Sequence, residues 1–179
     1  MSFYYLDIET TGLDPYKDKI IAITYQELDK EGNSVGDLII LKEWETSEFD
    51  ICVDLASLFR NSHTWGFMPV MQNYLFDFRF IFNKFNKYKI KHFPENELDF
   101  LYSLPFIDIK HFLVIKNNLE FVGSGLDKMT NKEHSGSHIP KLYENREYGL
   151  IEEYIKQETG AFIQTWKLII QQVQKMNLK

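Results

Sequence analysis

The sequence predicts an α/β fold: a mixed sheet whose first three strands are antiparallel, flanked by helices. Three observations lead to this prediction. A chain of 179 residues is the size of one ordinary domain, so we expect a single domain over 1–179. Its 44% apolar and 26% charged residues are usual for an ordered globular chain. Strand-like segments come first, and strand-like and helix-like segments then alternate.

Three segments near the start have the composition of strands. The first, Phe3 to Glu9, is aromatic and apolar and is followed by the turn-like pair Asp14-Pro15. The second and third, Lys19 to Gln26 and Asp37 to Lys42, are separated by a polar stretch that contains glycine and has hairpin-loop composition. Consecutive strands joined by such a loop are expected to pair antiparallel.

The middle of the chain changes to strand and helix patterns in alternation. Apolar residues recur at helical spacing from Asp50 to Arg60 and again from Tyr74 to Tyr88, with a strand predicted between them from Trp65 to Met71. The stretch from Lys91 to Pro140 is less regular, and it predicts only a short strand at Phe106 to Ile109.

Charge and cysteine content restrict the class of protein. The formal net charge is −6, so no general basic surface points to nucleic acid, although a site that gathers carboxylates around cations is compatible with an acidic chain. The single cysteine, Cys52, excludes an internal disulfide. No apolar stretch approaches the roughly 20 residues of a membrane helix. We expect a soluble cytoplasmic protein with no membrane partner.

Two acidic residues in the first predicted strand indicate a metal site. Asp7 and Glu9 are two residues apart and therefore project from the same face of the strand, while Leu6 and Ile8 project from the other. Carboxylates held close together repel each other unless a cation neutralises them, and hard oxygen ligands suit Mg²⁺ or Mn²⁺. The alternative is that both side chains are simply solvated at a strand end.

The continuation of this strand favours the metal site. The run Asp7-Ile8-Glu9-Thr10-Thr11-Gly12 resembles the first motif of the DEDD (DnaQ-like) 3′-to-5′ exonuclease superfamily. In that superfamily the D-x-E pair lies on the first strand of a ribonuclease H-like sheet. The resemblance therefore implies that fold for the predicted mixed sheet.

The resemblance also implies a second motif, in which Asn is followed by an aromatic residue and Asp at a strand-to-helix junction. Asn73-Tyr74-Leu75-Phe76-Asp77 has this form and this position. Taken alone, the same residues have an ordinary structural interpretation. Asn73 would be a helix N-cap, and Asp77 an acidic residue favoured by the helix dipole in the first turn.

A third motif is implied on a helix further along, and a long amphipathic helix is predicted from Gly149 to Lys175. Tyr154 and Glu158 lie four residues apart on one face of it, which matches the tyrosine (DEDDy) branch, except that the family has Asp where this chain has Glu158. Glu158 could instead extend outward into solvent. Tyr148 and Glu152 have the same spacing and rank second.

The histidine branch of the superfamily receives no support. Neither His134 nor His138 stands five residues before an acidic residue, and both fall in a stretch rich in Gly, Ser and His. We expect them to be loop residues.

The resemblance implies two-metal hydrolysis with two Mg²⁺ or Mn²⁺ ions. Asp7 would bridge both ions, and Tyr154 would orient the attacking water. The catalytic residues it implies are Asp7, Glu9, Asp77, Tyr154 and Glu158, all except Tyr154 being metal ligands. The residues it implies for contact with the terminal nucleotide are Thr10, Thr11, Leu13, Asn73 and Phe76.

Three functions are compatible with the sequence. The first is a metal-dependent 3′-to-5′ exonuclease that releases mononucleotides from the 3′ ends of single-stranded DNA or RNA. The second is a nucleic-acid-binding module of the same fold, catalytically weakened by Glu158. The third is a protein-interaction subunit that docks through its long C-terminal helix. The motif order favours the first.

Overall fold

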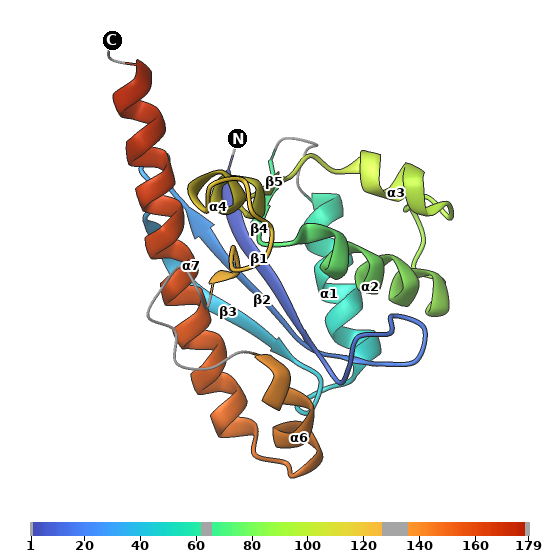
Figure 1. The fold of residues 1–179 in the computed structure, drawn as a ribbon. Coiled ribbons are helices and arrows are strands. Elements are labelled where there is room, and N and C mark those ends of the chain that lie inside the picture. Colours follow the sequence, from blue (N-terminus) through green and yellow to red (C-terminus); the bar gives the residue numbers. More distant parts are fainter. Residues whose placement is uncertain (1, 62–65, 127–135, 178–179) are drawn as a thin grey trace.

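The fold is built on a five-stranded mixed sheet, seen in a computed structural model that describes residues 2–61, 66–126 and 136–177. The strands lie in the order β3-β2-β1-β4-β5 (Figure 1). Their bounds are β1 Phe3–Thr10, β2 Ile20–Leu28, β3 Ser34–Lys42, β4 Met68–Met71 and β5 Ile107–Asp108. The predicted α/β fold with three antiparallel first strands is confirmed.

Strand β1 is the centre of this sheet. It pairs antiparallel with β2 along its whole length, and β2 pairs antiparallel with β3. On its other side β1 pairs in parallel with β4, but only from Phe3 to Tyr5, and β5 extends the sheet in parallel beyond β4. The end of β1 that carries Asp7 and Glu9 therefore runs past β4. This leaves room beside the two carboxylates for residues that follow β4.

Helices cover both faces of the sheet. In Figure 1, α1 and α2 lie on one face and the long α7 crosses the other. None of the helices in the described residues combines the length and apolar composition that a membrane crossing requires. The helices are α1 Glu48–Asn61, α2 Tyr74–Lys87, α3 Glu97–Ser103, α4 Lys110–Lys116, the 3₁₀ turn η1 Gly136–His138, α6 Ile139–Glu144 and α7 Tyr148–Asn177.

The side chains of β1 point alternately to the two faces of the sheet and pack into different buried clusters. Leu6 and Ile8 are buried with the apolar residues of α1 and α2. Tyr5 points to the opposite face, where its ring packs against Phe162 of α7 at a centroid distance of 4.5 Å. Because side chains alternate in a strand, Asp7 and Glu9 share the α7 face with Tyr5. A helix that packs on this face can bring its own side chains to the two carboxylates.

The structure differs most from the sequence prediction between Lys91 and Pro140. This stretch contains α3 and α4, each of seven residues, and neither was predicted. A helix of two turns has too few residues to show a clear period. Elsewhere the predicted elements are present with shifted ends, and the strand predicted to begin at Trp65 begins at Met68, with Trp65 outside the described residues.

Candidate metal centre

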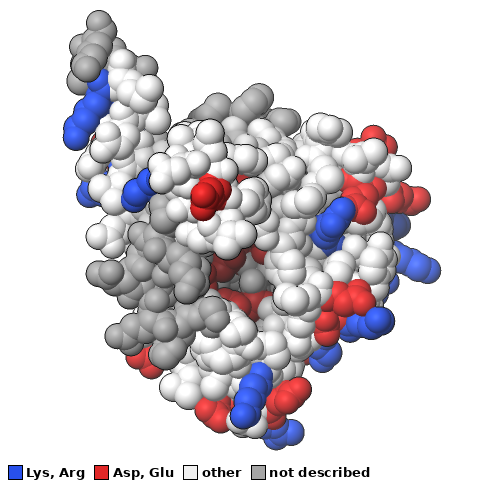
Figure 2. Space-filling model, in the orientation of Figure 1, with Lys and Arg blue, Asp and Glu red and all other residues white. Residues whose placement is uncertain are grey.

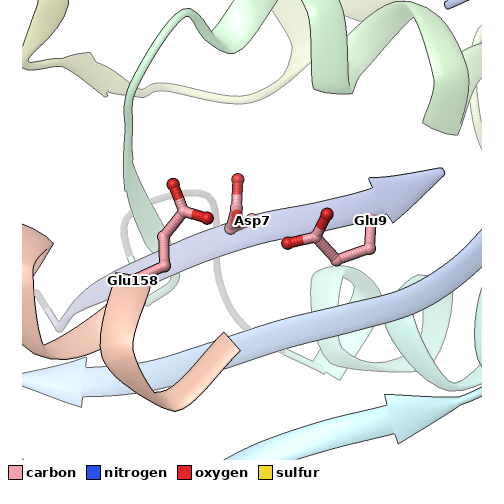
Figure 3. A group of neighbouring side chains, drawn as sticks. All are labelled: Asp7, Glu9 and Glu158. Atoms are coloured by element: carbon pink, nitrogen blue, oxygen red, sulfur yellow. The ribbon is translucent and has the colours of Figure 1, made fainter. Parts of the chain in front are cut away.

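Three carboxylates from distant parts of the sequence meet at one point. Asp7, Glu9 and Glu158 each offer one oxygen, and these oxygens all lie within 4.8 Å of one another. Figure 3 shows that Asp7 and Glu9 project from β1 and that Glu158 reaches them from α7. Because Asp7 and Glu9 are one strand period apart, both face the helix. Glu158 belongs to this cluster and does not extend away from the protein.

The cluster is electrostatically costly in the absence of a cation. Glu9 is almost fully buried, and Asp7 and Glu158 are only partly exposed, so water screens their repulsion poorly. Oxygen ligands of this charge suit small hard divalent cations such as Mg²⁺ or Mn²⁺. The donor set therefore fits the metals that the sequence implied.

Asp77 adds a fourth carboxylate to the same environment. It lies in α2, just after β4, and its side chain is only 3% exposed. Burial raises the pKa of Asp77 well above its ordinary value, and the charges of Asp7, Glu9 and Glu158 raise it further. The negative charges of Asp7, Glu9 and Glu158 therefore act on Asp77. Asp77 lies in the first turn of α2, as the structural alternative stated, but it is buried and under the influence of the other carboxylates.

Asn73 does not cap α2 in the usual way. It occupies the cap position in the left-handed conformation, with φ 62° and ψ 46°, and its side chain makes no capping hydrogen bond. Its backbone N–H donates instead to Oδ1 of Asp108 at 3.0 Å. Asn73 is therefore the N-cap residue of α2 by position, as the structural alternative stated, but its side chain does not make the capping hydrogen bond. Asparagine is one of the few residues that adopt this conformation readily.

Asp108 is a residue of the site that sequence analysis missed. It ends β5, and its Oδ1 also accepts the backbone N–H of Lys110 at 2.9 Å. Its charge contributes to the raised pKa of Asp77. The signal available was an acidic residue within the short strand predicted from Phe106 to Ile109.

Tyr154 lies one helical turn before Glu158 and is largely buried. Burial raises the pKa of Tyr154, and so do the negative charges of Glu158 and Glu9 and a hydrogen bond with Glu158. The tyrosine is therefore a neutral phenol at physiological pH. Its hydroxyl is held at the edge of the carboxylate cluster as a potential donor.

The short turn η1 covers this tyrosine. The rings of His138 and Tyr154 meet edge to face with centroids 5.2 Å apart, and a Cβ added at Gly136 would lie 3.1 Å from the tyrosine hydroxyl. His138, expected as an ordinary loop residue, thus packs on a residue of the site. His134 lies outside the described residues.

The second-ranked pair, Tyr148 and Glu152, lies elsewhere. Glu152 forms an ion pair with Lys42 at 2.9 Å, and Tyr148 stacks on Trp44 with a centroid distance of 4.9 Å. Both partners belong to the β3 side of the sheet. Between the two alternatives left open by spacing, the structure brings Glu158 to Asp7 and Glu9 and keeps Glu152 away.

The residues expected to contact a nucleotide fall into two groups. The hydroxyl of Thr10 donates to the carbonyl of Gly12 at 2.6 Å, and that of Thr11 accepts the Lys19 N–H at 2.9 Å, so both hydroxyls stabilise the loop after β1. The other three expected residues line a groove of about 650 Å³ between that loop and α2; they are Leu13, Asn73 and Phe76.

The surface around the site matches an acidic pocket. Figure 2 shows acidic atoms at the bottom of a hollow in the face drawn there, while Lys and Arg side chains lie toward the periphery of that face. Such a hollow repels phosphate unless cations occupy it. The acidic character of the hollow thus agrees with a site whose carboxylate oxygens bind cations.

The sequence as a whole matches one known family. The family model of the RNase H superfamily matches residues 4–165, a range that contains all four carboxylates and Tyr154. No curated protein sequence matches the chain significantly.

Solved structures of exonuclease I share the fold at low sequence identity. The zinc-bound complex of Escherichia coli exonuclease I with single-stranded DNA has a TM-score of 0.58 at 17% identity, over 79% of this chain and 38% of that chain. The E. coli enzyme with a dA16 oligonucleotide gives 0.52 at 16%, over 68% and 31%. Exonuclease I from Methylocaldum szegediense gives 0.52 at 19%, over 68% and 30%. The chain thus spans well under half the length of these proteins.

Proposed function

The chain belongs to the RNase H superfamily, and from this premise we propose that it is a metal-dependent 3′-to-5′ exonuclease of the DEDD type. It would act as a single domain over 1–179 and release mononucleotides from single-stranded nucleic acid. The observation that carries the proposal is the convergence of Asp7, Glu9 and Glu158 beside the buried Asp77. Carboxylates gathered beside the central strand of this fold would repel one another, and bound cations would offset that repulsion.

The ligand set fits two Mg²⁺ or Mn²⁺ ions. Asp7, Glu9 and Glu158 would hold them from β1 and α7, and Asp77 would complete the set from α2. Bound cations of this kind polarise the scissile phosphate and allow water to ionise near neutral pH. The phenol of Tyr154, kept neutral and hydrogen-bonded to Glu158, would orient the attacking water, and this role supports placing the chain in the tyrosine branch.

The proposed substrate is the 3′ end of a single strand. Leu13, Asn73 and Phe76 would contact the terminal nucleotide from the groove, while Thr10 and Thr11 would act through the loop that they stabilise. The terminal nucleotide would enter the acidic hollow as a free end, which favours a single strand as the substrate. Single-stranded DNA is the first substrate to test, since the E. coli relative of this fold was solved with it. RNA is the second.

The test uses an oligonucleotide labelled at its 5′ end, with Mn²⁺ or Mg²⁺. We expect a ladder of shortened labelled strands, no cleavage of circular single-stranded DNA, and no reaction with a chelator. Asp7→Ala should lower the rate by at least about 100-fold, because loss of a metal ligand costs more than loss of a residue supporting one. Glu152→Ala is the matched control, since this acid pairs with Lys42 outside the cluster. A rate unaffected by Asp7→Ala would exclude the proposal.

A catalytically weakened binding module is the second candidate, and one observation favours it. Glu158 stands where the resembled family has Asp, and its longer side chain places the carboxylate differently. This candidate predicts cation-dependent binding of single strands with little turnover, and faster turnover in Glu158→Asp. Robust hydrolysis by the wild-type protein, made slower by Glu158→Asp, would exclude it.

A further inference from the structure

Tyr5 carries a buried hydroxyl that the packing of its ring does not explain. The side chain is 2% exposed, and its hydroxyl has no hydrogen-bond partner among the described residues. In the same part of the chain, Nε1 of Trp166 is the one other buried side-chain polar atom in this state. An unpaired buried donor costs free energy, and a phenylalanine would fill the same space without that cost. The hydroxyl therefore indicates a role beyond packing.

The two unpaired groups lie in different surroundings. Trp166 faces the turn between β2 and β3, where a Cβ added at Gly32 would lie 3.3 Å from the Cδ1 of its indole. Tyr5 precedes Asp7 by two residues in β1, so both side chains project from the same face of the sheet. Of the two unpaired groups, the Tyr5 hydroxyl is the one beside a proposed metal ligand.

Strand β1 and helix α7 present matching rows of side chains to each other. On the helix, Glu158 and Phe162 are about one turn apart and share a face. The ring of Tyr5 packs on Phe162 with centroids 4.5 Å apart. In the next step along both rows, Asp7 faces Glu158, which reaches toward it from α7 (Figure 3). The phenol is thus held by Phe162 one step away from the carboxylate cluster.

The charges of the cluster act on this phenol. Burial raises the pKa of Tyr5 well above its ordinary value, and the negative charges of Asp7 and Glu158 raise it further. Thr159, the residue after Glu158, is a polar neighbour of the phenol. Its own hydroxyl donates to the carbonyl of Ile155 at 2.8 Å, and its contact with Tyr5 falls short of a hydrogen bond. The Tyr5 hydroxyl thus lies at the turn of α7 that carries Glu158.

Glu158 is the carboxylate best able to reach this hydroxyl. Because packing fixes the phenol, the acceptor has to move toward it. The side chain of Glu158 has one more rotatable bond than that of Asp7, and it leaves the helix beside Thr159. A carboxylate has about four acceptor positions. A hydrogen bond with Tyr154 uses one of them, which leaves positions for a cation and for the Tyr5 hydroxyl.

We propose that Tyr5 is a positioning residue of the metal centre, whose hydroxyl donates to the Glu158 carboxylate when that carboxylate serves as a cation ligand. The inference rests on the proposed function and adds a residue to the same site. Glu158 is one methylene longer than the Asp of the resembled family, so its carboxylate has more conformations to lose on binding a cation. A hydrogen bond from a fixed phenol restricts those conformations. Tyr5 touches neither cation nor substrate and acts only through Glu158.

The first experiment measures Mn²⁺ binding by calorimetry in Tyr5→Phe, with Tyr4→Phe as the matched control. Both changes remove one hydroxyl from β1, but Tyr4 lies on the other face of the sheet, where its ring stacks on Phe67. Tyr5→Phe should weaken Mn²⁺ binding about tenfold, as expected for a residue that supports a metal ligand. Tyr4→Phe should bind Mn²⁺ as the wild-type protein does. An unchanged affinity in Tyr5→Phe overturns the proposal.

The melting temperature in chelator separates this role from a structural one. Because the hydroxyl has no partner without a cation, Tyr5→Phe should leave the melting temperature in chelator unchanged or raise it. The increase in melting temperature on adding Mn²⁺ should be smaller in Tyr5→Phe than in Tyr4→Phe. A melting temperature that falls in chelator would show that the hydroxyl supports the fold itself, and would overturn the proposal.

Glu158→Asp identifies the acceptor. Its shorter side chain does not reach the Tyr5 hydroxyl, so Tyr5→Phe should have no further effect on Mn²⁺ affinity in that background. A further tenfold loss there would overturn the role of Glu158 as acceptor.

These measurements also separate the inference from the proposed function, because none of them requires hydrolysis. An inactive protein whose Mn²⁺ affinity falls in Tyr5→Phe would refute the nuclease and retain the positioning role. An active nuclease with unchanged affinity in Tyr5→Phe would refute the positioning role alone. A wild-type protein that binds no Mn²⁺ would refute both.

Discussion

The backbone N–H of Asn73 donates to the carboxylate of Asp108, so the start of α2 is attached to the end of the neighbouring strand β5. This bond holds Asn73 in a left-handed conformation directly before the helix that carries Asp77. The same carboxylate accepts the N–H of Lys110 at the start of α4. One acidic residue thus fixes two helix starts beside the carboxylate cluster.

Replacing Asp108 tests this attachment. Asp108→Ala leaves the N–H groups of Asn73 and Lys110 without their protein acceptor, and we expect a loss of about 1 kcal/mol in the free energy of unfolding. Asp108→Asn retains the acceptor oxygen and should keep most of that stability. Urea unfolding of the two variants measures the difference. Equal stability of Asp108→Ala and the wild-type protein would contradict the role described for Asp108.

Removing the Asp77 charge should stabilise the metal-free protein and weaken its binding of metal. Asp77 is buried among like charges, so Asp77→Asn should raise the melting temperature of the protein in chelator. The same variant should bind Mn²⁺ more weakly by calorimetry, since it loses a ligand. Glu152→Gln, on an acid already paired with Lys42, should change neither quantity in this way. A melting temperature in chelator that falls in Asp77→Asn would argue against mutual repulsion at the site.

The lowered pKa of Glu48 predicts that the free energy of unfolding decreases in acid. Burial alone would raise the pKa of Glu48, but hydrogen bonds from Tyr88, Lys87 and the Ile20 N–H outweigh it and hold the pKa below the ordinary value of 4.5. A lowered pKa stabilises the fold fully above the ordinary value, and this contribution is lost as pH falls through the folded value.

The measurement is urea unfolding at a series of pH values from 6 downward. The wild-type protein should lose stability below about pH 4.5, and Glu48→Gln should lose less over the same interval because the group no longer titrates. Glu45→Gln removes an exposed acid from a surface ion pair and should retain the wild-type profile. Parallel profiles for the wild type and Glu48→Gln would show that Glu48 is not the responsible group.

Cys52 should be chemically inert in the folded protein. It is fully buried in α1, and burial raises the pKa of its thiol to about 12, so almost no thiolate is present at neutral pH. A disulfide-exchange reagent should therefore label no thiol in the native protein and one thiol per chain in denaturant. Rapid labelling under native conditions would reveal local opening of α1.

Local periodicity explains which parts of the site were predictable. Asp7 and Glu9 are one strand period apart, and Tyr154 and Glu158 are about one helical turn apart, so their shared faces follow from geometry over a few residues. The structure places each of these pairs as the periods indicate. Their assignment as metal ligands and as a water-orienting tyrosine remains a prediction.

The parts that were not predictable depend on contacts between distant segments. The bond from Asn73 to Asp108 and the bond from Lys84 to Asp18 each join residues more than thirty positions apart. No local pattern marks either contact. Lys84 lies on the buried face of α2, and its acceptors, the carbonyl oxygens of Pro15 and Asp18, are set by where the loop after β1 folds. The backbone conformation of Asn73 likewise follows from its partner on β5.

The docking of α7 on the sheet is required for the three carboxylates to come together. On one side of Glu158 the helix is packed through Ile151 and Ile155, and on the other side through Phe162 and Trp166. Glu158 therefore reaches Asp7 only after the helix has docked along the sheet. Contacts of such wide sequence separation require the entropic cost of loop closure before they form. A chain in which α7 is not docked would carry Asp7 and Glu9 without their third partner, so the proposed metal site would be complete only in the finished fold.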